Sequence, residues 1–147
     1  MPGRRLSTTT EPALRFFLDR GLGSRIVPGA LRGAGWELET MDERYGLSAS
    51  QGILDVKWIE EATANGDVLL SKDMAIARNP LEAAAIYRAS ARAFALARQD
   101  VDGQSMVKCL PANQQRIFRM ARRAAGPYVV SVSENGLRRA PLNLTAV

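Results

Sequence analysis

The stretch LRFFLD at residues 14–19 is a short apolar run that ends in an aspartate, and it opens the pattern that decides the fold. Such a run, followed by Arg20 and Gly21, is typical of a buried strand that stops at a turn. A second run of this kind, VLLSKD at residues 68–73, ends in Asp73. Because the sequence between the two runs has helical spacing, we expect parallel strands joined by helical crossovers.

Two helices and one further strand are predicted between these runs. The first helix places Leu22, Ile26, Val27, Ala30, Leu31 and Ala34 on one apolar face and ends before Gly35. Because Pro28 removes a hydrogen bond inside a helix, this helix either begins close to Pro28 or bends there. A short strand follows at residues 36–41, and a polar loop extends over residues 42–51. The second helix starts between residues 50 and 55 and ends near Asn65. Its inward side chains are Leu54, Trp58, Ile59 and Ala62.

A capped helix and another strand follow the second apolar run. Asn79 and Pro80 match an N-cap and a first-turn proline, and Glu82 matches the acid of a capping box. These three residues predict a helix over residues 80–88. A fourth parallel strand is expected at residues 93–96, although the segment is poor in β-branched residues.

The end of the chain is predicted to form a helical segment and a hairpin. Residues 103–125 have helical spacing, with an interruption at Pro111. Alternating segments at residues 128–133 and 137–142 flank an Asn-Gly pair at residues 135–136. Since Asn-Gly tolerates the positive φ of a tight turn, these segments predict a β-hairpin.

One domain is expected. A chain of 147 residues can bury about two-thirds of the surface that its unfolded form exposes. We expect a flexible arm at residues 1–12 and an α/β domain at residues 13–147. The domain divides into a βα core at residues 14–96 and a helical segment with the hairpin at residues 97–147. No apolar run reaches the roughly 18 residues of a membrane span, so no membrane association is expected.

The composition excludes several chemistries. The chain has no histidine and one cysteine, Cys109, which excludes Ser-His-Asp triads and Cys-His catalysis. A lone cysteine suits a reducing compartment, so we expect a cytoplasmic protein. Twenty basic residues against fifteen acidic ones give a net charge of +5, which favours a polyanionic partner without establishing one.

Four aspartates are candidates for a metal site. Asp19 and Asp73 end parallel strands, so both should lie at one edge of the sheet. Asp42 follows the predicted strand at 36–41 on that edge, and Asp55 opens the helix leading to the next strand. Carboxylates about 5 Å apart repel one another by roughly 3 kcal/mol, so the cluster requires a cation. Oxygen ligands without His or Cys select Mg²⁺ or Mn²⁺.

Ordinary structural roles remain open for the same residues. Aspartate is common in turns after strands, and Asp55 also suits the first turn of a helix. The arginines between Arg116 and Arg123 form either a solvated helix face or a nucleic-acid track. Trp58 and Tyr128 are expected in the core rather than as base-stacking platforms.

These motifs together resemble PIN-like ribonucleases, and more closely the VapC-type toxins of bacterial toxin-antitoxin pairs. The resemblance rests on FFLD at residues 16–19, the acid after the second strand, Asp55 ahead of Trp58-Ile59, and LLSKD at residues 69–73. It covers residues 14–96, and ARRAAGPYVVSVS at residues 121–133 is similar to the same toxins. It implies a PIN-like three-layer sandwich with a mainly parallel sheet.

The resemblance also implies roles for individual residues. Asp19 and Asp73 would be core metal ligands, Asp55 would complete or bridge the site, and Asp42 or Glu43 would be the fourth acid. Ser71 would orient the carboxylate two residues later. The commoner family pattern instead places an acid on an intermediate helix. Candidate phosphate contacts are Arg20, Lys72 and Arg78.

The activity implied is Mg²⁺- or Mn²⁺-dependent cleavage of RNA, with a cognate antitoxin that masks the acids and self-association into a homodimer. Two other functions compete with it. A receiver-like phospho-acceptor domain would need an acidic pair at the first strand, where Asp19 stands alone. A degenerate scaffold that binds RNA or a protein partner without catalysis would keep the acids but hold no productive metal.

Overall fold

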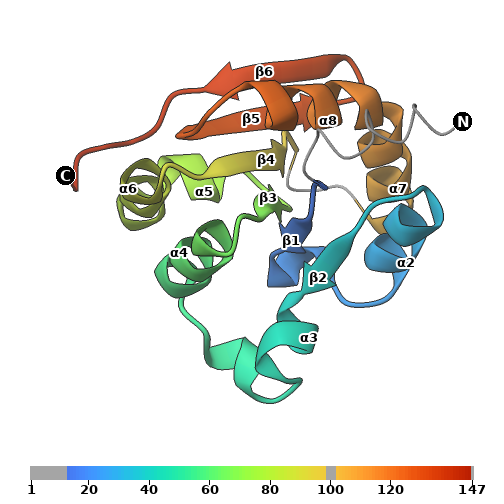
Figure 1. Ribbon diagram of the computed structural model, residues 1–147, viewed down its shortest axis with the longest axis horizontal. Helices are drawn as coiled ribbons and strands as arrows, with labels where there is room; N and C mark the ends of the chain where they lie inside the picture. The colour runs from blue at the N-terminus through green and yellow to red at the C-terminus, as the bar shows by residue number, and fades with distance from the viewer. Residues whose placement is uncertain (1–12, 99–101, 147) are drawn as a thin grey trace, which may run out of the picture.

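The computed structural model describes residues 13–98 and 102–146, and within them the chain forms one six-stranded sheet covered by helices on both faces (Figure 1). The strands are β1 (Phe16–Leu18), β2 (Leu38–Thr40), β3 (Val68–Ser71), β4 (Arg92–Leu96), β5 (Tyr128–Ser133) and β6 (Gly136–Ala140). Their order across the sheet is β2-β1-β3-β4-β5-β6, and β6 alone of these runs antiparallel to its neighbour. The predicted parallel sheet and C-terminal hairpin are confirmed.

The helices follow the strands in βα order. They are the 3-10 turn η1 (Arg20–Leu22), α2 (Ile26–Gly33), α3 (Met41–Tyr45), the 3-10 turn η2 (Ala49–Gly52), α4 (Asp55–Ala64), α5 (Ala75–Arg78), α6 (Pro80–Ala89), α7 (Gly103–Ala112) and α8 (Gln114–Arg123). In the described part of the chain, no helix is long and apolar enough to cross a membrane. The predicted arm at residues 1–12 lies outside the described residues.

The sheet separates two apolar cores, which makes the fold a three-layer α/β sandwich. Strand side chains alternate between the faces, so Phe16 and Leu18 enter one core and Phe17 enters the other. The first core is closed by α2, α7 and α8, and the second by α3, α4, α5 and α6. Trp58 and Tyr128 are buried, as predicted.

Several predicted details differ from the structure. The helix predicted within residues 22–34 begins at Ile26, close to Pro28 as one of the two alternatives had it, because Arg20–Leu22 forms a separate 3-10 turn after β1. The prediction that Ile26 and Leu54 point inward is wrong, since they are 66% and 74% exposed. Both lie at helix starts, where the buried face has not yet begun.

The segment predicted as a polar loop at residues 42–51 is largely helical. Thr40 caps α3, because its hydroxyl accepts a hydrogen bond from the Glu43 backbone N–H while Glu43 accepts one from the Thr40 backbone N–H. This reciprocal capping stabilises a helix too short for hydrophobic periodicity to reveal. The loop prediction is therefore wrong for α3 and η2.

The helical segment predicted at residues 103–125, with an interruption at Pro111, forms two helices that meet at Asn113. Pro111 lies in the last turn of α7, and α8 begins after Asn113. The buried Asn113 side chain donates to the carbonyl oxygens of Cys109 and Ser133, at 2.9 and 3.0 Å. Asn113 thus ties the junction between the helices to the end of β5.

Candidate active site

Asp19 lies at the carboxyl end of the central strand, beside the end of β3. The two strands pair in register, Leu18 opposite Leu70, and the Asp19 backbone N–H donates to the Leu70 carbonyl at 3.0 Å. This pairing places Asp19 next to Ser71, whose hydroxyl donates to Asp19 Oδ2 at 2.6 Å. The Lys72 backbone N–H donates to the same oxygen at 3.3 Å. The fold therefore fixes the orientation of the Asp19 carboxyl group.

The other oxygen of Asp19 has no partner. Oδ1 is buried and accepts no hydrogen bond from any described residue. Burial raises the pKa of Asp19 to about 6, and the charge of Asp73 adds to the rise, while the hydrogen bonds from Ser71 and Lys72 oppose it. A buried carboxylate with an unsatisfied oxygen is costly, and a cation would compensate for it.

Glu82, in the first turn of α6, is a member of the site that the sequence interpretation missed. The pKa of Glu82 is raised to about 7. Burial is the largest cause, and the charges of Asp55, Asp73 and Asp19 add to it in that order. Glu82 therefore lies near enough to Asp55, Asp73 and Asp19 for their charges to add to the effect of burial on its pKa.

Asp55 opens α4, as predicted, and is held by two donors. Its Oδ1 accepts a hydrogen bond from the Arg20 guanidinium at 3.1 Å and another from Trp58 Nε1 at 2.9 Å. Arg20 also donates to the backbone carbonyls of Ser50 and Ile53, at 3.3 and 2.5 Å. Arg20 therefore binds the segment before α4 to the end of β1 and orients Asp55.

Asp73 lies just beyond β3 on the same edge. Its Oδ1 accepts a hydrogen bond from the Ala75 backbone N–H at 2.8 Å. The resemblance implied that Ser71 orients the Asp73 carboxylate. In the structure the Ser71 hydroxyl donates to the Asp19 carboxylate instead, and its contact with Asp73 is a 3.2 Å approach to the main-chain oxygen.

Asp42 and Glu43, the two candidates for the fourth acid, are engaged elsewhere. Glu43 caps α3 and accepts two hydrogen bonds from Arg32, at 2.8 and 2.9 Å, which is the main cause of its lowered pKa. Asp42 Oδ1 accepts a hydrogen bond from the Ser50 hydroxyl at 2.5 Å. Asp42 lines a small hollow with Arg20 and Gln51, and Asp55 is not among the residues of that hollow.

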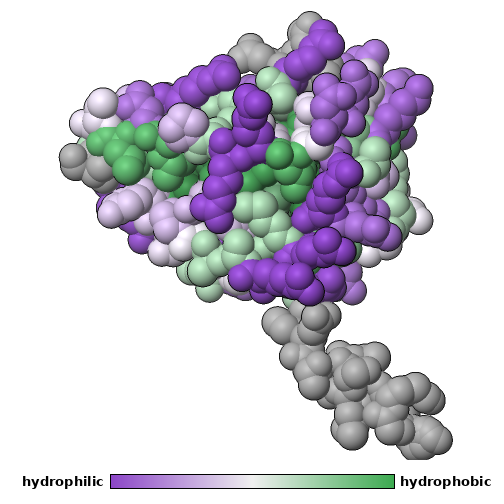
Figure 2. Space-filling model, turned by 90° about the horizontal axis from the view of Figure 1, so that it is seen from above, coloured by the Kyte–Doolittle hydropathy of each residue, from purple (hydrophilic) through white to green (hydrophobic). Residues whose placement is uncertain are grey.

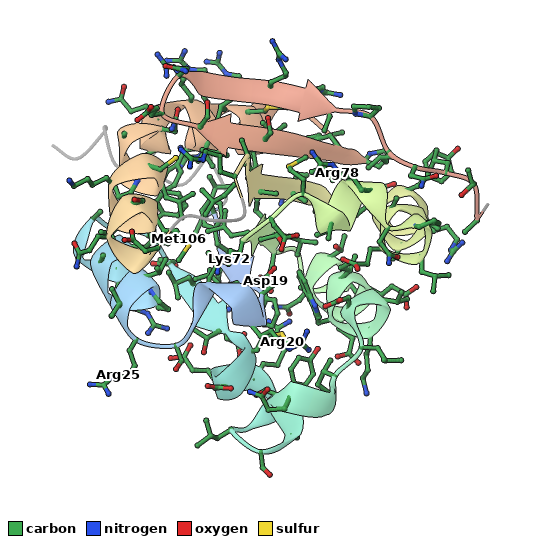
Figure 3. The ribbon with its side chains drawn as sticks, turned by 180° about the vertical axis from the view of Figure 1, so that it is seen from behind. Asp19, Arg20, Arg25, Lys72, Arg78 and Met106 are labelled. Atoms are coloured by element: carbon green, nitrogen blue, oxygen red, sulfur yellow. The ribbon has the colours of Figure 1, made fainter. Side chains whose placement is uncertain are left out.

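Of the three candidate phosphate contacts, Arg20 and Lys72 lie beside the acids, Arg20 through its ion pair with Asp55 and Lys72 through its backbone N–H on Asp19. Figure 3 shows Asp19, Arg20 and Lys72 together at the end of β1 and β3, with Arg78 farther along the same side. Arg78 ends α5, and its side chain is exposed. Arg20 is already bonded to Asp55, so it differs from Lys72 and Arg78 in having a structural role.

Gly21 allows the η1 turn to pack closely against Asp19 and Lys72. A Cβ atom at this position would lie 2.9 Å from the Lys72 Cβ and 3.2 Å from Asp19 Oδ1. The η1 turn can therefore approach β3 closely only with glycine here, and this approach encloses the Asp19 carboxyl group.

The residues at this edge provide hard oxygen donors and a buried oxygen without a partner, which suits a small divalent cation. Within residues 13–98 and 102–146, no three His, Cys, Asp or Glu side chains already form a metal cage. The donor set fits the chemistry of Mg²⁺ or Mn²⁺, while the carboxyl groups stand apart in the conformation described.

Comparison with known proteins defines the class to which this fold and edge site belong. Residues 14–98 match the family model described as a PIN like domain, so the chain belongs to the PIN-like domain family. It is also similar to the protein named "Putative ribonuclease VapC45" of Mycobacterium tuberculosis (strain ATCC 25618 / H37Rv). The two are 35% identical over 123 residues, which cover 84% of this chain and 88% of the relative. No solved structure gave a significant match.

Proposed function

We propose that this protein is a metal-dependent endoribonuclease that hydrolyses RNA phosphodiesters at the edge formed by Asp19, Asp55, Asp73 and Glu82. One observation carries the proposal: Asp19 and Asp73 follow the carboxyl ends of two paired parallel strands, and the buried Oδ1 of Asp19 accepts no hydrogen bond from any described residue. Membership of the PIN-like family and similarity to a protein named as a ribonuclease support it.

The four acids would have different roles in metal binding. Asp19, with its orientation fixed by Ser71 and its Oδ1 unpaired, and Asp73 would be the main metal ligands. Asp55 and Glu82, which face them from α4 and α6, would complete the site. A bound Mg²⁺ or Mn²⁺ would polarise the phosphodiester and lower the pKa of a water molecule.

We assign the fourth acid to Glu82 rather than to Asp42 or Glu43. Glu43 is bonded to Arg32 and to the start of α3, so its removal from those partners would cost stability. Burial is the main cause of the raised pKa of Glu82, and the charges of Asp55, Asp73 and Asp19 add to it, so Glu82 lies near the other acids. It also restores the commoner family pattern, in which an intermediate helix supplies an acid.

The remaining parts of the proposal concern substrate and partners. Lys72 and Arg78 would contact phosphates beside the scissile bond, while Arg20 would chiefly orient Asp55. Similarity to a VapC protein supports a toxin role, with a cognate antitoxin that masks the acids and a homodimeric assembly. The single Cys109 suits the cytoplasm.

The test compares thermal unfolding in chelator and in a Mn²⁺ titration for the wild type, Asp73→Asn and Glu82→Gln. At 100 times its dissociation constant, a ligand specific to the folded state adds about 2.7 kcal/mol of stability. We expect this rise in the wild type and its loss in both variants, together with loss of Mn²⁺-dependent RNA cleavage.

Glu43→Gln is the matched control, because it also removes one acid and should keep the metal response and the cleavage. If the wild type shows no metal response but still binds RNA, the proposal fails and the non-catalytic RNA-binding function takes its place. Normal cleavage by Asp73→Asn would equally exclude the site.

A further inference from the structure

The C-terminal part of the chain contains all of the net positive charge. Residues 102–147 include seven basic and two acidic residues, whereas residues 1–101 include thirteen of each. Four arginines of α8 are exposed, namely Arg116, Arg119, Arg122 and Arg123. The opposite face of α8 is apolar and buries Ile117 and Ala121. The helix therefore presents its charge outward, over the core that it covers.

Three of these arginines share one side of α8, and the first of them, Arg116, lies next to β6. Residues 116, 119 and 123 follow the i, i+3, i+7 spacing of a single helix face. The Arg116 guanidinium lies 3.8 Å from where a Cβ on Gly136 would stand, which places this arginine next to β6. Arg139 of β6 lies over the Tyr128 ring at 5.0 Å, on the same face of the sheet. We call Arg116, Arg119, Arg123 and Arg139 the arginine face.

No carboxylate neutralises the arginine face. None of its four side chains forms an ion pair with an acid in the described residues. The large hydrophobic side chains exposed in the described chain are Ile26, Leu47, Leu54, Leu81 and Tyr87, and none belongs to α8 or β6. Figure 2 views the molecule from the side on which β6 lies and shows long hydrophilic side chains with hydrophobic surface between them.

This combination selects the kind of partner. Protein interfaces are anchored by buried aromatic and aliphatic side chains, which the arginine face lacks. A nucleic-acid backbone needs rows of guanidinium groups, which donate to successive phosphates. From Arg116 to Arg123 the helix rises about 10 Å, enough for about two neighbouring phosphates of one strand.

The arginine face begins at the same sheet edge as the acids. Asp19 and Asp73 lie at the carboxyl ends of β1 and β3, and Arg116 stands beside the turn after β5. Three strand spacings of about 4.8 Å, roughly 14 Å in all, separate β3 from β6. A hollow at the ends of β4 and β5, lined in part by Ala97 and Ser133, lies between them. A strand bound at the acids can therefore follow this edge to α8.

We propose that the arginine face is a second binding surface for the phosphates of a single-stranded RNA whose scissile bond lies at the acids. The inference rests on the proposed nuclease function and adds the requirement that a good substrate extends well beyond the cleaved bond. Binding at the face needs no metal, so it can be tested separately from catalysis.

The first experiment measures binding of a labelled, unstructured RNA of about 20 nucleotides by fluorescence anisotropy in chelator, over a range of salt concentrations. The test variant is Arg119→Gln/Arg123→Gln. The control is Lys57→Gln/Arg88→Gln, which removes two exposed basic residues from α4 and α6 and gives the same net charge. We expect at least a tenfold loss of affinity in the test variant and less than threefold in the control.

The salt dependence separates direct phosphate binding from general attraction. For single strands the slope of log K against log salt falls by about 0.7 for each phosphate that the protein no longer neutralises, so the removal of two arginines at the face lowers it by about 1.4. Equal losses of affinity in both variants, or no loss in either, would overturn the proposal. No loss in either variant would favour an acidic protein as the partner of the arginine face.

The second experiment measures Mn²⁺-dependent cleavage of the same RNA and of a trinucleotide, which is too short to reach α8 from the acids. We expect the test variant to raise KM for the long RNA and to leave the trinucleotide unaffected. Absence of cleavage by the wild type would reject the nuclease function, while the binding result would still decide the role of the arginine face.

Discussion

Residues 13–98 and residues 102–146 use their arginines in different ways. In the first region Arg15, Arg20, Arg32 and Arg44 form five ion pairs with acids. In the second, Arg116, Arg119, Arg123 and Arg139 pair with no described acid, and the region holds the whole net charge of the chain. The difference accords with the proposal that the ion pairs of the first region stabilise the structure and the site, while the arginines of the second region bind a partner.

The strongest test of this comparison is Arg44→Met. Arg44 is bonded to Glu39 at 2.6 Å and to the buried Asp67 at 2.8 Å, and it lies 4.3 Å from the Phe17 ring centroid. Its removal leaves a buried carboxylate short of a partner, so we expect a loss of about 3 kcal/mol in the free energy of unfolding, measured by urea denaturation. Arg119→Met should change it by less than about 0.5 kcal/mol. Equal losses would contradict the division into two regions.

The second test compares an acid of the first region that is paired with an arginine and an acid that is not. Glu43 is paired with Arg32, whereas Glu82 faces other acids. We expect Glu82→Gln to lower the rate of Mn²⁺-dependent RNA cleavage by at least about 100-fold, equivalent to roughly 2.7 kcal/mol. Glu43→Gln should keep the rate within about twofold and cost about 1 kcal/mol of stability through the weakened helix cap. The reverse pattern would return the fourth-ligand role to Glu43.

The third test is the pH dependence of the metal-free protein. Burial raises the pKa of Asp19 from 3.8 to about 6, and burial with neighbouring acids raises that of Glu82 from 4.5 to about 7. The folded state therefore holds these protons more tightly than the unfolded chain does. Their stabilising effect is complete below about pH 4 and is lost as the pH rises through 6 and 7.

Asp19→Asn isolates this effect, because asparagine does not ionise. In chelator, we expect the variant to gain roughly 2 kcal/mol on the wild type between pH 4 and pH 7, measured as the difference in unfolding free energy. At pH 7, saturating Mn²⁺ should make the wild type more stable than Asp19→Asn, since only the wild type can bind the ion through the Asp19 carboxylate. A constant difference across the pH range would show that Asp19 has an ordinary pKa.

The part of the site that could be predicted is the part fixed by strand direction. Asp19 and Asp73 follow apolar runs, and parallel strands must bring their carboxyl ends to one edge, so sequence order alone places them together. Asp55 followed from its position at a helix start. Glu82 also lies at a helix start, but its spacing from Asn79 suggested that it belongs to a capping box and not to the site. In the structure the Asn79 side chain caps α6 by accepting hydrogen bonds from the backbone N–H groups of Leu81 and Glu82, and the Glu82 carboxyl group takes no part in the cap.

The errors have a common physical cause. Apolar character alone predicts Ile26 and Leu54 inward, although at a helix start the next turn, not the first residue, meets the core. Glu43 and Asp42 follow a strand at the correct edge, yet α3 turns Glu43 toward Arg32 and Asp42 toward Ser50. Such choices depend on which partner a side chain reaches, which no single-sequence pattern contains.

The smallest expected effect comes from Arg119→Glu. Arg119 has arginines at i−3, i+3 and i+4, so a glutamate there would form a favourable i, i+4 pair with Arg123 and remove like-charge repulsion. We expect unfolding free energy to rise by about 0.5 kcal/mol at low salt, with the gain shrinking in high salt, while RNA affinity falls below that of Arg119→Gln. A loss of stability would show that the Arg119 guanidinium supports the fold. A gain accompanied by weaker binding would mean that α8 keeps its arginines at the expense of its own stability, as a surface built for a polyanion should.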